Sequence, residues 1–120
     1  MTLQECYAAM GGNYEEVLGR LRSERLIQKF VLKFVDDGSY QLLVDSMASQ
    51  NYEDAFRAAH TIKGVCQNLG LTRLLDSSSQ LSEALRHGYT PEADSLAERV
   101  GRDYQETIGA IRAFQSSTGA

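Results

Sequence analysis

Four residues of one short segment combine side-chain types and spacing that could do chemistry. His60, Lys63, Gly64 and Gln67 stand at positions i, i+3, i+4 and i+7, and residues three and four apart lie one above another on a helix face. Imidazole offers a neutral nitrogen nucleophile near physiological pH. A phosphoryl group accepted by that nitrogen would add a charge of about −2, which an ammonium group one turn away would offset.

Gly64 is the strongest signal in this set. Glycine inside a helix costs roughly 1 kcal/mol relative to alanine, so helix stability does not explain its presence. It lies about 40° beyond His60 on the helical wheel, away from the apolar stripe. This position favours the close approach of a partner over the close packing of a neighbouring helix. Gln67, on the next turn, offers a hydrogen bond to a phosphoryl oxygen or to a partner's backbone.

The element that must position these residues is a helix predicted over 51–69. Asn51 is a good N-cap, and Asp54 places negative charge in the first turn, where it suits the helix dipole. Gly70 is a typical stop signal. The predicted buried stripe of this helix consists of Ala55, Ala59, Ile62, Cys66 and Leu69. His60, Lys63, Gly64 and Gln67 then lie on a flank of the helix about 120° from that stripe.

The rest of the chain also shows helical periodicity and no strand-like alternation. Short helices are predicted to begin at Thr2, Asn13 and Ser23, and the other long helices cover about 37–49, 71–86 and 91–115. Thr90 and Pro91 start the last helix, and residues 116–120 are predicted to fray. Short connections favour antiparallel neighbours. The predicted fold is all-α, an antiparallel up-down-up-down four-helix bundle.

We expect a single domain over 1–120, with helices within 1–35 covering the bundle of 37–115. Its 120 residues are 42% apolar and 23% charged, which is typical of one globular domain. The net charge of −4 argues against nucleic-acid binding, and no apolar run reaches membrane-spanning length. Cys6 and Cys66 lack the clustering of a metal site or a disulfide scaffold. With no visible signal peptide, the cytoplasm is the default location.

The segment from Ala59 to Gly70 resembles the signature of histidine-containing phosphotransfer (HPt) domains. That signature reads His, any residue, an aliphatic residue, Lys, Gly, four variable positions, then an aliphatic residue and Gly. The matching positions are His60, Ile62, Lys63, Gly64, Leu69 and Gly70. The predicted order of helices is similar over the whole chain. Val65 and Cys66 depart from the pattern, because many members carry Ser or Ala there.

The resemblance implies a relay step in two-component signalling. His60 would take a phosphoryl group from an aspartate of one receiver domain and pass it to an aspartate of another, with Lys63, Gly64 and Gln67 completing the site. The implied partners are response-regulator receiver domains and a hybrid histidine kinase. No cofactor is expected, because the Mg²⁺ belongs to the receiver. The chain would be a monomeric phosphohistidine carrier, not a self-sufficient enzyme, without kinase activity or a membrane role.

Supporting roles follow from position. Phe56, one turn before His60, is a candidate apolar anchor for the partner, and Arg57 would add positive charge to the docking surface. An equal count from the Gly70 turn places residues 79–83 opposite His60. Ser79, Ser82 or Glu83 is therefore expected to hold the second imidazole nitrogen, and Ser82 is included among the docking residues.

Two other functions remain open at this point. One is a helical adaptor that binds receivers or other proteins without phosphate transfer, against which the intact His60 argues. The other is a small hydrolase or lyase with His60 as general base. That function needs an acid or a nucleophile beside the histidine and a concave pocket, and the sequence shows no such constellation. The sequence also contains no glycine-rich phosphate loop.

Overall fold

The computed structural model describes residues 1–118, and this part of the chain is helical without a strand. Its seven helices are α1 (Leu3–Met10), α2 (Tyr14–Leu21), α3 (Glu24–Phe34), α4 (Ser39–Ala48), α5 (Tyr52–Leu69), α6 (Thr72–Leu85) and α7 (Glu92–Thr118). The predicted all-α class is confirmed.

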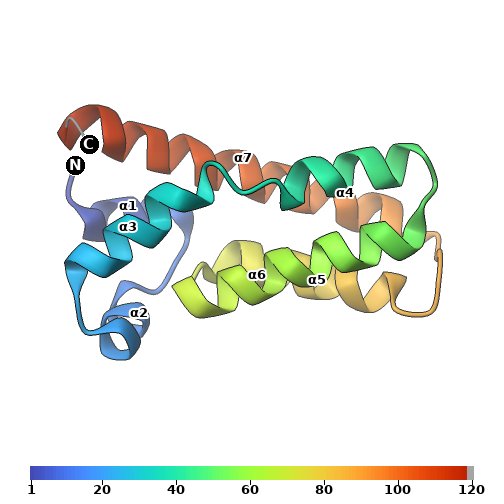
Figure 1. Cartoon of the computed structure of the whole chain (residues 1–120), viewed down its shortest axis with the longest axis horizontal. Helices are drawn as coiled ribbons and strands as arrows, with labels where there is room; N and C mark the ends of the chain where they lie inside the picture. The colour runs from blue at the N-terminus through green and yellow to red at the C-terminus, as the bar shows by residue number, and fades with distance from the viewer. Residues whose placement is uncertain (119–120) are drawn as a thin grey trace.

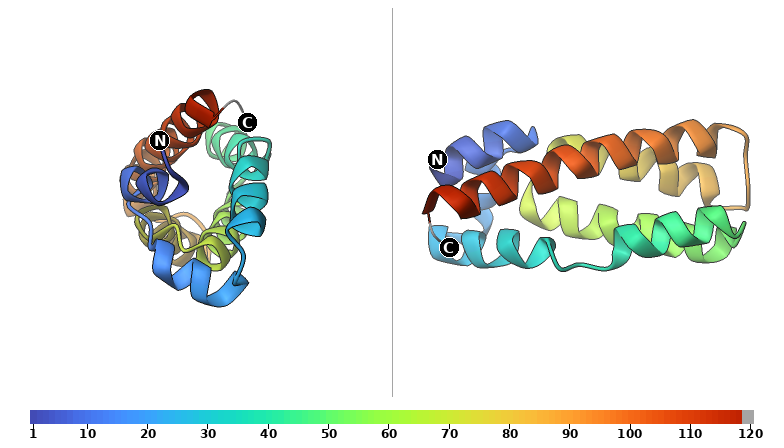
Figure 2. Two further views of the ribbon diagram at one scale, coloured as in Figure 1. Left: turned by 90° about the vertical axis from the view of Figure 1, so that its left-hand side faces the viewer. Right: turned by 90° about the horizontal axis from the view of Figure 1, so that it is seen from above.

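Helices α4 to α7 run antiparallel to their neighbours in chain order (Figure 1). Helix α4 packs on α5, α5 on α6, and α6 on α7. With 27 residues, α7 is longer than its neighbours and runs the whole length of the molecule (Figure 2). This is the predicted up-down-up-down bundle with short additional N-terminal helices.

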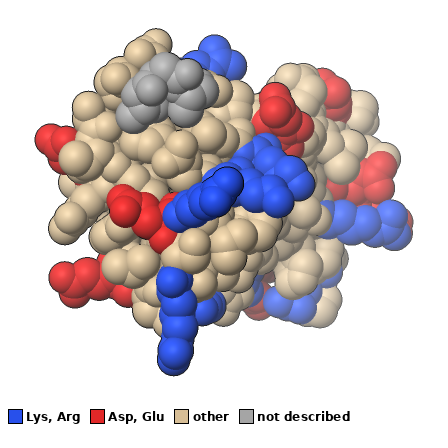
Figure 3. Space-filling view, turned by 60° about the vertical axis from the view of Figure 1, so that its left-hand side comes forward, with Lys and Arg blue, Asp and Glu red and all other residues tan. Residues whose placement is uncertain are grey.

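The three N-terminal helices gather at one end of the molecule. Helix α1 packs along the C-terminal half of α7, and α3 continues into α4 through a short connection (Figures 1 and 2). The surface at this end carries Lys and Arg side chains that gather near the middle of the face (Figure 3).

Local capping explains where most helices begin and end. The side chains of Asn13, Ser23 and Asn51 each accept a hydrogen bond from a backbone N–H three residues on, as N-cap residues do. Gly11 and Gly70 end α1 and α5 with φ of 66° and 67°, in the left-handed region that glycine adopts without penalty. The predicted starts of α2, α3 and α5 are confirmed.

The last helix differs from its prediction at both ends. The Thr90 hydroxyl donates to the Ala84 carbonyl (3.1 Å) instead of capping α7, which begins at Glu92. Helix α7 continues to Thr118, so the predicted fraying is wrong for residues 116–118. There the Ser117 hydroxyl donates to the Phe114 carbonyl (2.9 Å). Residues 119–120 lie outside the described residues.

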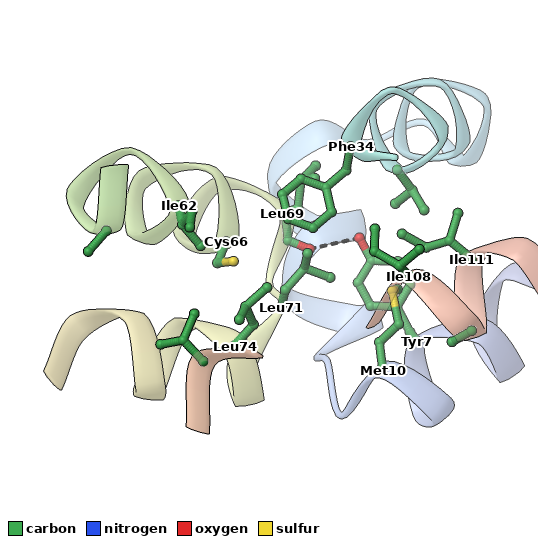
Figure 4. Close-up of a cluster of buried hydrophobic side chains, with 14 of the residues drawn as sticks. Tyr7, Met10, Phe34, Ile62, Cys66, Leu69, Leu71, Leu74, Ile108 and Ile111 are labelled. Atoms are coloured by element: carbon green, nitrogen blue, oxygen red, sulfur yellow. Dashed lines mark hydrogen bonds between the residues drawn. The ribbon is translucent and has the colours of Figure 1, made fainter. Parts of the chain in front are cut away.

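The core continues from the bundle into the N-terminal helices (Figure 4). Buried side chains of α1 and α3, such as Tyr7, Met10 and Phe34, meet Leu69 of α5 and Ile111 of α7. The Tyr7 hydroxyl donates to the Leu69 carbonyl at 2.7 Å. The short helices are therefore part of the core at the end of α5, where they help to hold the helix that carries His60.

Candidate functional site

Helix α5 buries its apolar stripe and exposes the face that carries His60, as the sequence predicts. Its apolar stripe is buried, with no member more than 2% exposed, and consists of Ala55, Ala59, Ile62, Cys66 and Leu69. His60, Gly64 and Gln67 are exposed, and Lys63 is half-buried. These four residues form what we call the His60 stripe. Because the apolar residues of the same helix pack into the core, the face with these four residues is left toward solvent.

The His60 imidazole is oriented by an aromatic ring, not by a hydrogen bond. It stacks on Phe56, with ring centroids 5.9 Å apart and an interplanar angle of 18°. Within the described residues it has no hydrogen-bond partner. Both ring nitrogens are therefore free of protein hydrogen bonds, and one of them can act as a nucleophile.

The expected hydrogen bond from α6 is absent, so that prediction is wrong. Ser82 is 1% exposed, and its Oγ has no partner among the described residues. The register of α6 turns Ser82 inward, which also removes it from any docking surface. Glu83 instead pairs with Arg86 at 3.0 Å. No hydrogen bond joins Ser79 to His60 in the part of the chain that the structure describes.

Arg86 supports the His60 ring indirectly. Its guanidinium carbon lies 5.8 Å from the centroid of the Phe56 ring, within the range of a cation–π contact. The Phe56 ring is thus in contact with both Arg86 and His60. Arg86 was not predicted as a site residue, although antiparallel pairing brings the end of α6 beside the start of α5, where Phe56 lies.

Lys63 and Gly64 provide charge and space beside the imidazole. Lys63 forms no ion pair with any described residue, so its ammonium group is available to a new anion. A Cβ added at Gly64 would meet no atom within 4 Å apart from its chain neighbours and the nearby backbone of its own helix. Close packing of a neighbouring helix is therefore not the reason for this glycine, and the space beside it is open to a partner.

Arg57 does not present a free charge. Its guanidinium group pairs with Glu53 at 2.6 Å and with Asp54 at 3.5 Å, both on the preceding turn of α5. Its positive charge is therefore matched by two carboxylates of the same helix, and the surface around it is not basic.

Arg20 of α2 is a further residue of this face that sequence reasoning missed. Its Nη2 donates to the carbonyls of Gln67 and Asn68, both at 2.9 Å, and its Nε also donates to Asn68. Together with Gly64, these residues line a hollow of about 280 Å³. Arg20 is 47 residues from Gln67 in the chain, so no spacing motif could have found it.

The arrangement has the features of a group-acceptor site on an open surface. Within the described residues, no three His, Cys, Asp or Glu side chains cluster as a metal ion would require. None of the described helices has the length and apolar character needed to cross a bilayer. The exposed nucleophile, the adjacent ammonium group and the open space at Gly64 are suited to a reaction whose other half is supplied by a partner.

Comparison with known families agrees with this geometry. A family model described as the Hpt domain matches residues 15–114 of the 120-residue chain. No match was found among curated proteins or among solved structures. The matched span begins in α2, ends in α7 and contains the whole His60 stripe. The helical bundle, the exposed histidine of its second long helix and this match lead to one conclusion: the chain belongs to the Hpt domain family.

Proposed function

We propose that this protein relays a phosphoryl group between receiver-domain aspartates, with His60 as the phosphorylated residue. A histidine phosphotransfer role is the function of the family. The observation that supports its assignment to this site is the His60 imidazole itself, which is exposed, free of hydrogen bonds to the described residues and on the same helix face as the open space at Gly64.

The proposed reaction is a reversible displacement at phosphorus. An imidazole nitrogen of His60 attacks the phosphorus of a receiver's aspartyl phosphate and forms a P–N bond. The P–O bond to the aspartate breaks, and the aspartate leaves as a carboxylate with the bonding electron pair. The reverse sequence, with a second receiver's aspartate as nucleophile, moves the phosphoryl group on. The Mg²⁺ that neutralises the transferring oxygens would be bound by the receiver.

The other residues of the His60 stripe have distinct roles in this proposal. Lys63 places a positive charge one turn from His60, where it offsets the negative charge of the phosphoryl group. Gly64 leaves room for that group and for the receiver. Gln67 lies at the far end of the stripe, where its amide is available to the receiver. Phe56, which also contacts Arg86, stacks on the imidazole and keeps it in a fixed orientation.

The proposal includes the setting of the reaction. The partners are receiver domains and, as donor, a hybrid histidine kinase, and the protein acts as a monomer. We propose the cytoplasm as its location, which is supported by two free and buried thiols, Cys6 and Cys66, since such thiols are typical of a reducing compartment.

The test is transfer of labelled phosphate from phosphorylated receiver domains of the source genome. We expect a label that is stable in alkali and lost in acid, as a phosphohistidine is, and we expect His60→Gln to abolish it. His87→Gln is the matched control, because His87 is the other histidine and is also exposed. Equal labelling of His60→Gln and the parent would refute the proposal. Receiver binding without any transfer would instead support the adaptor function.

A further inference from the structure

The His60 stripe is continuous with an open groove between α3 and α5. The groove has a volume of about 440 Å³, and its lining includes Phe30 and Lys33 of α3 and Thr61, Gly64 and Asn68 of α5. Gly64 belongs to both the groove and the His60 stripe, and Gly64 and Asn68 also line the hollow beside Arg20. A protein seated over Gly64 would thus face the groove on one side and Arg20 on the other.

An aromatic side chain at this groove is only partly covered. Phe30 is 36% exposed, although its neighbours Ile27, Val31 and Phe34 are buried. Leu26, one turn earlier, is 41% exposed and lines a separate hollow along α3, not the groove itself. Partly exposed apolar side chains beside an open groove provide the kind of central contact on which protein interfaces depend.

The α3 side of this surface is basic in an acidic protein, and Asp37 is an acidic residue in the lining of the groove. Five of the 12 Lys and Arg residues lie between positions 20 and 33, and they are Arg20, Arg22, Arg25, Lys29 and Lys33. The three on α3 form no ion pair with the described residues. Figure 3 shows Lys and Arg side chains near the middle of the face at this end of the molecule, with Asp and Glu side chains beside them.

The opposite end of the His60 stripe has neither feature. Arg57 is paired with two carboxylates. The Phe56 ring is half-buried, with Arg86 near one part of it and His60 stacked against it. At this end, a docking protein would meet a charge that is already paired and an apolar ring that is already in contact with Arg86 and His60.

We propose that the receiver domain docks from His60 toward the C-terminal end of α5, over the α3–α5 groove. An apolar side chain of the receiver occupies the groove beside Phe30, and the cations of α3 face its acidic rim. The charge complementarity follows from the chemistry of the partner, because binding Mg²⁺ beside an aspartyl phosphate requires carboxylate ligands. This inference rests on the proposed phosphotransfer function and deepens it by naming the contact surface.

An anionic membrane is the competing occupant of a basic face with exposed apolar residues. The receiver is favoured because the groove shares Gly64 with the His60 stripe, so one partner covers both. The apolar stripe of α3, formed by Ile27, Val31 and Phe34, is also buried in the protein core, which leaves little apolar surface for insertion into lipid.

The test measures the kinetics of transfer from a phosphorylated receiver that labels the parent protein. The variants are Phe30→Ser and the double charge reversal Lys29→Glu with Lys33→Glu. We expect KM for the phosphorylated receiver to rise about tenfold in each, with kcat within about twofold of the parent, because the lost contacts bind ground state and transition state alike. Helicity by circular dichroism checks that each variant folds.

Matched controls lie elsewhere on the molecule. Leu42→Ser removes an apolar side chain of α4 that is 47% exposed, and Arg102→Glu reverses an exposed charge on α7. Both should leave KM unchanged. Arg57→Glu tests the opposite end of the stripe and should also have little effect.

Three outcomes would separate the ideas. If the parent transfers phosphate but the α3 variants keep its KM, or if Arg57→Glu alone raises KM, the docking direction is wrong. If the charge reversal abolishes sedimentation with phosphatidylserine vesicles and leaves KM unchanged, the face binds membranes and the inference is overturned. Failure of His60→Gln to abolish labelling refutes the phosphotransfer proposal itself, whatever the KM values show.

Discussion

At the scale of single residues, Gly64 is a position where helix stability and the proposed function favour different side chains. It lies inside α5, where glycine is unfavourable, and a Cβ at this position would have no atom within 4 Å beyond the adjacent part of its own helix. The space is therefore available for a substitution, and the proposed function requires that it stay empty.

We expect substitutions of Gly64 to stabilise the helix, and bulky ones to slow phosphoryl transfer. We expect Gly64→Ala to raise the free energy of unfolding by up to about 1 kcal/mol, because alanine removes the entropic penalty of glycine. Gly64→Gln should also fold, yet its bulk beside His60 should slow transfer strongly. Urea unfolding and receiver-to-protein transfer rates measure the two effects. A fast Gly64→Gln variant would show that the space is not used.

Lys63 is expected to act on the reaction and not on the fold. Since its ammonium group has no ion pair among the described residues, Lys63→Ala should leave helicity and thermal stability nearly unchanged while slowing transfer to His60. Lys63→Arg should restore part of the rate, because it retains the positive charge. A parallel loss of helicity and transfer in Lys63→Ala would instead indicate a structural role.

At the scale of elements, the C-terminal end of α5 is held by the N-terminal helices. The last carbonyls of a helix lack partners within that helix. Here Arg20 satisfies those of Gln67 and Asn68, and the Tyr7 hydroxyl satisfies that of Leu69. The helix that carries His60 therefore depends on residues that precede it by about 50 positions or more in the chain.

Loss of the Tyr7 hydroxyl should weaken this junction. Tyr7→Phe leaves the ring in place but leaves the buried Leu69 carbonyl without its partner, which costs about 1–3 kcal/mol. We expect that decrease in the free energy of unfolding by urea. Tyr89→Phe is the control, since its hydroxyl bonds the exposed Asp94, and its effect should be small. Equal effects of the two substitutions would contradict the role assigned to Tyr7.

At the scale of the whole molecule, buried ionisable groups make the folded protein less stable at alkaline pH. Burial raises the pKa of the Cys6 thiol to about 11 and that of the Cys66 thiol to about 12, from an ordinary value of 9.0. Burial also raises the pKa of the Tyr7 hydroxyl. Above about pH 9 the unfolded chain releases thiol protons that the folded protein retains, so the folded state loses stability as the pH rises.

We therefore expect the urea midpoint to fall between pH 8 and pH 11, with no comparable change between pH 7 and pH 8. The double variant Cys6→Ala with Cys66→Ala should show a smaller fall, because two of the groups responsible are gone. A thiol reagent at pH 8 should label neither cysteine of the folded parent and both after unfolding. Rapid labelling of the folded protein would contradict the burial on which this expectation depends.

The predictability of the fold can be judged from particular helices. The caps at Asn13, Ser23 and Asn51 and the stop at Gly70 act within a few residues, so local sequence locates those helix boundaries. The ends of α7 were predicted less well. Thr90 bonds Ala84 across a turn instead of its own helix, and a contact of this kind is not encoded in cap preferences.

The candidate site also has a part that is predictable from the sequence and a part that is not. The phase of α5 follows from its own periodicity, so the exposure of His60, Gly64 and Gln67 is predictable from the sequence. The residues that surround this face from other helices were not predicted correctly. Arg20 was missed because it comes from α2, 47 residues before Gln67. Ser82, expected at the surface, is buried, because an antiparallel register differs easily by a turn from an equal count of residues.

The sequence by itself determined the helices, the order of the bundle and the exposed face of α5 on which His60, Gly64 and Gln67 lie. These properties depend on interactions between residues that are three or four positions apart. Only the tertiary structure decided what lies beside that face: the groove against α3, the guanidinium group of Arg20 and the contact of Arg86 with the Phe56 ring. Those neighbours come from distant parts of the chain, and the packing of whole helices brings them together.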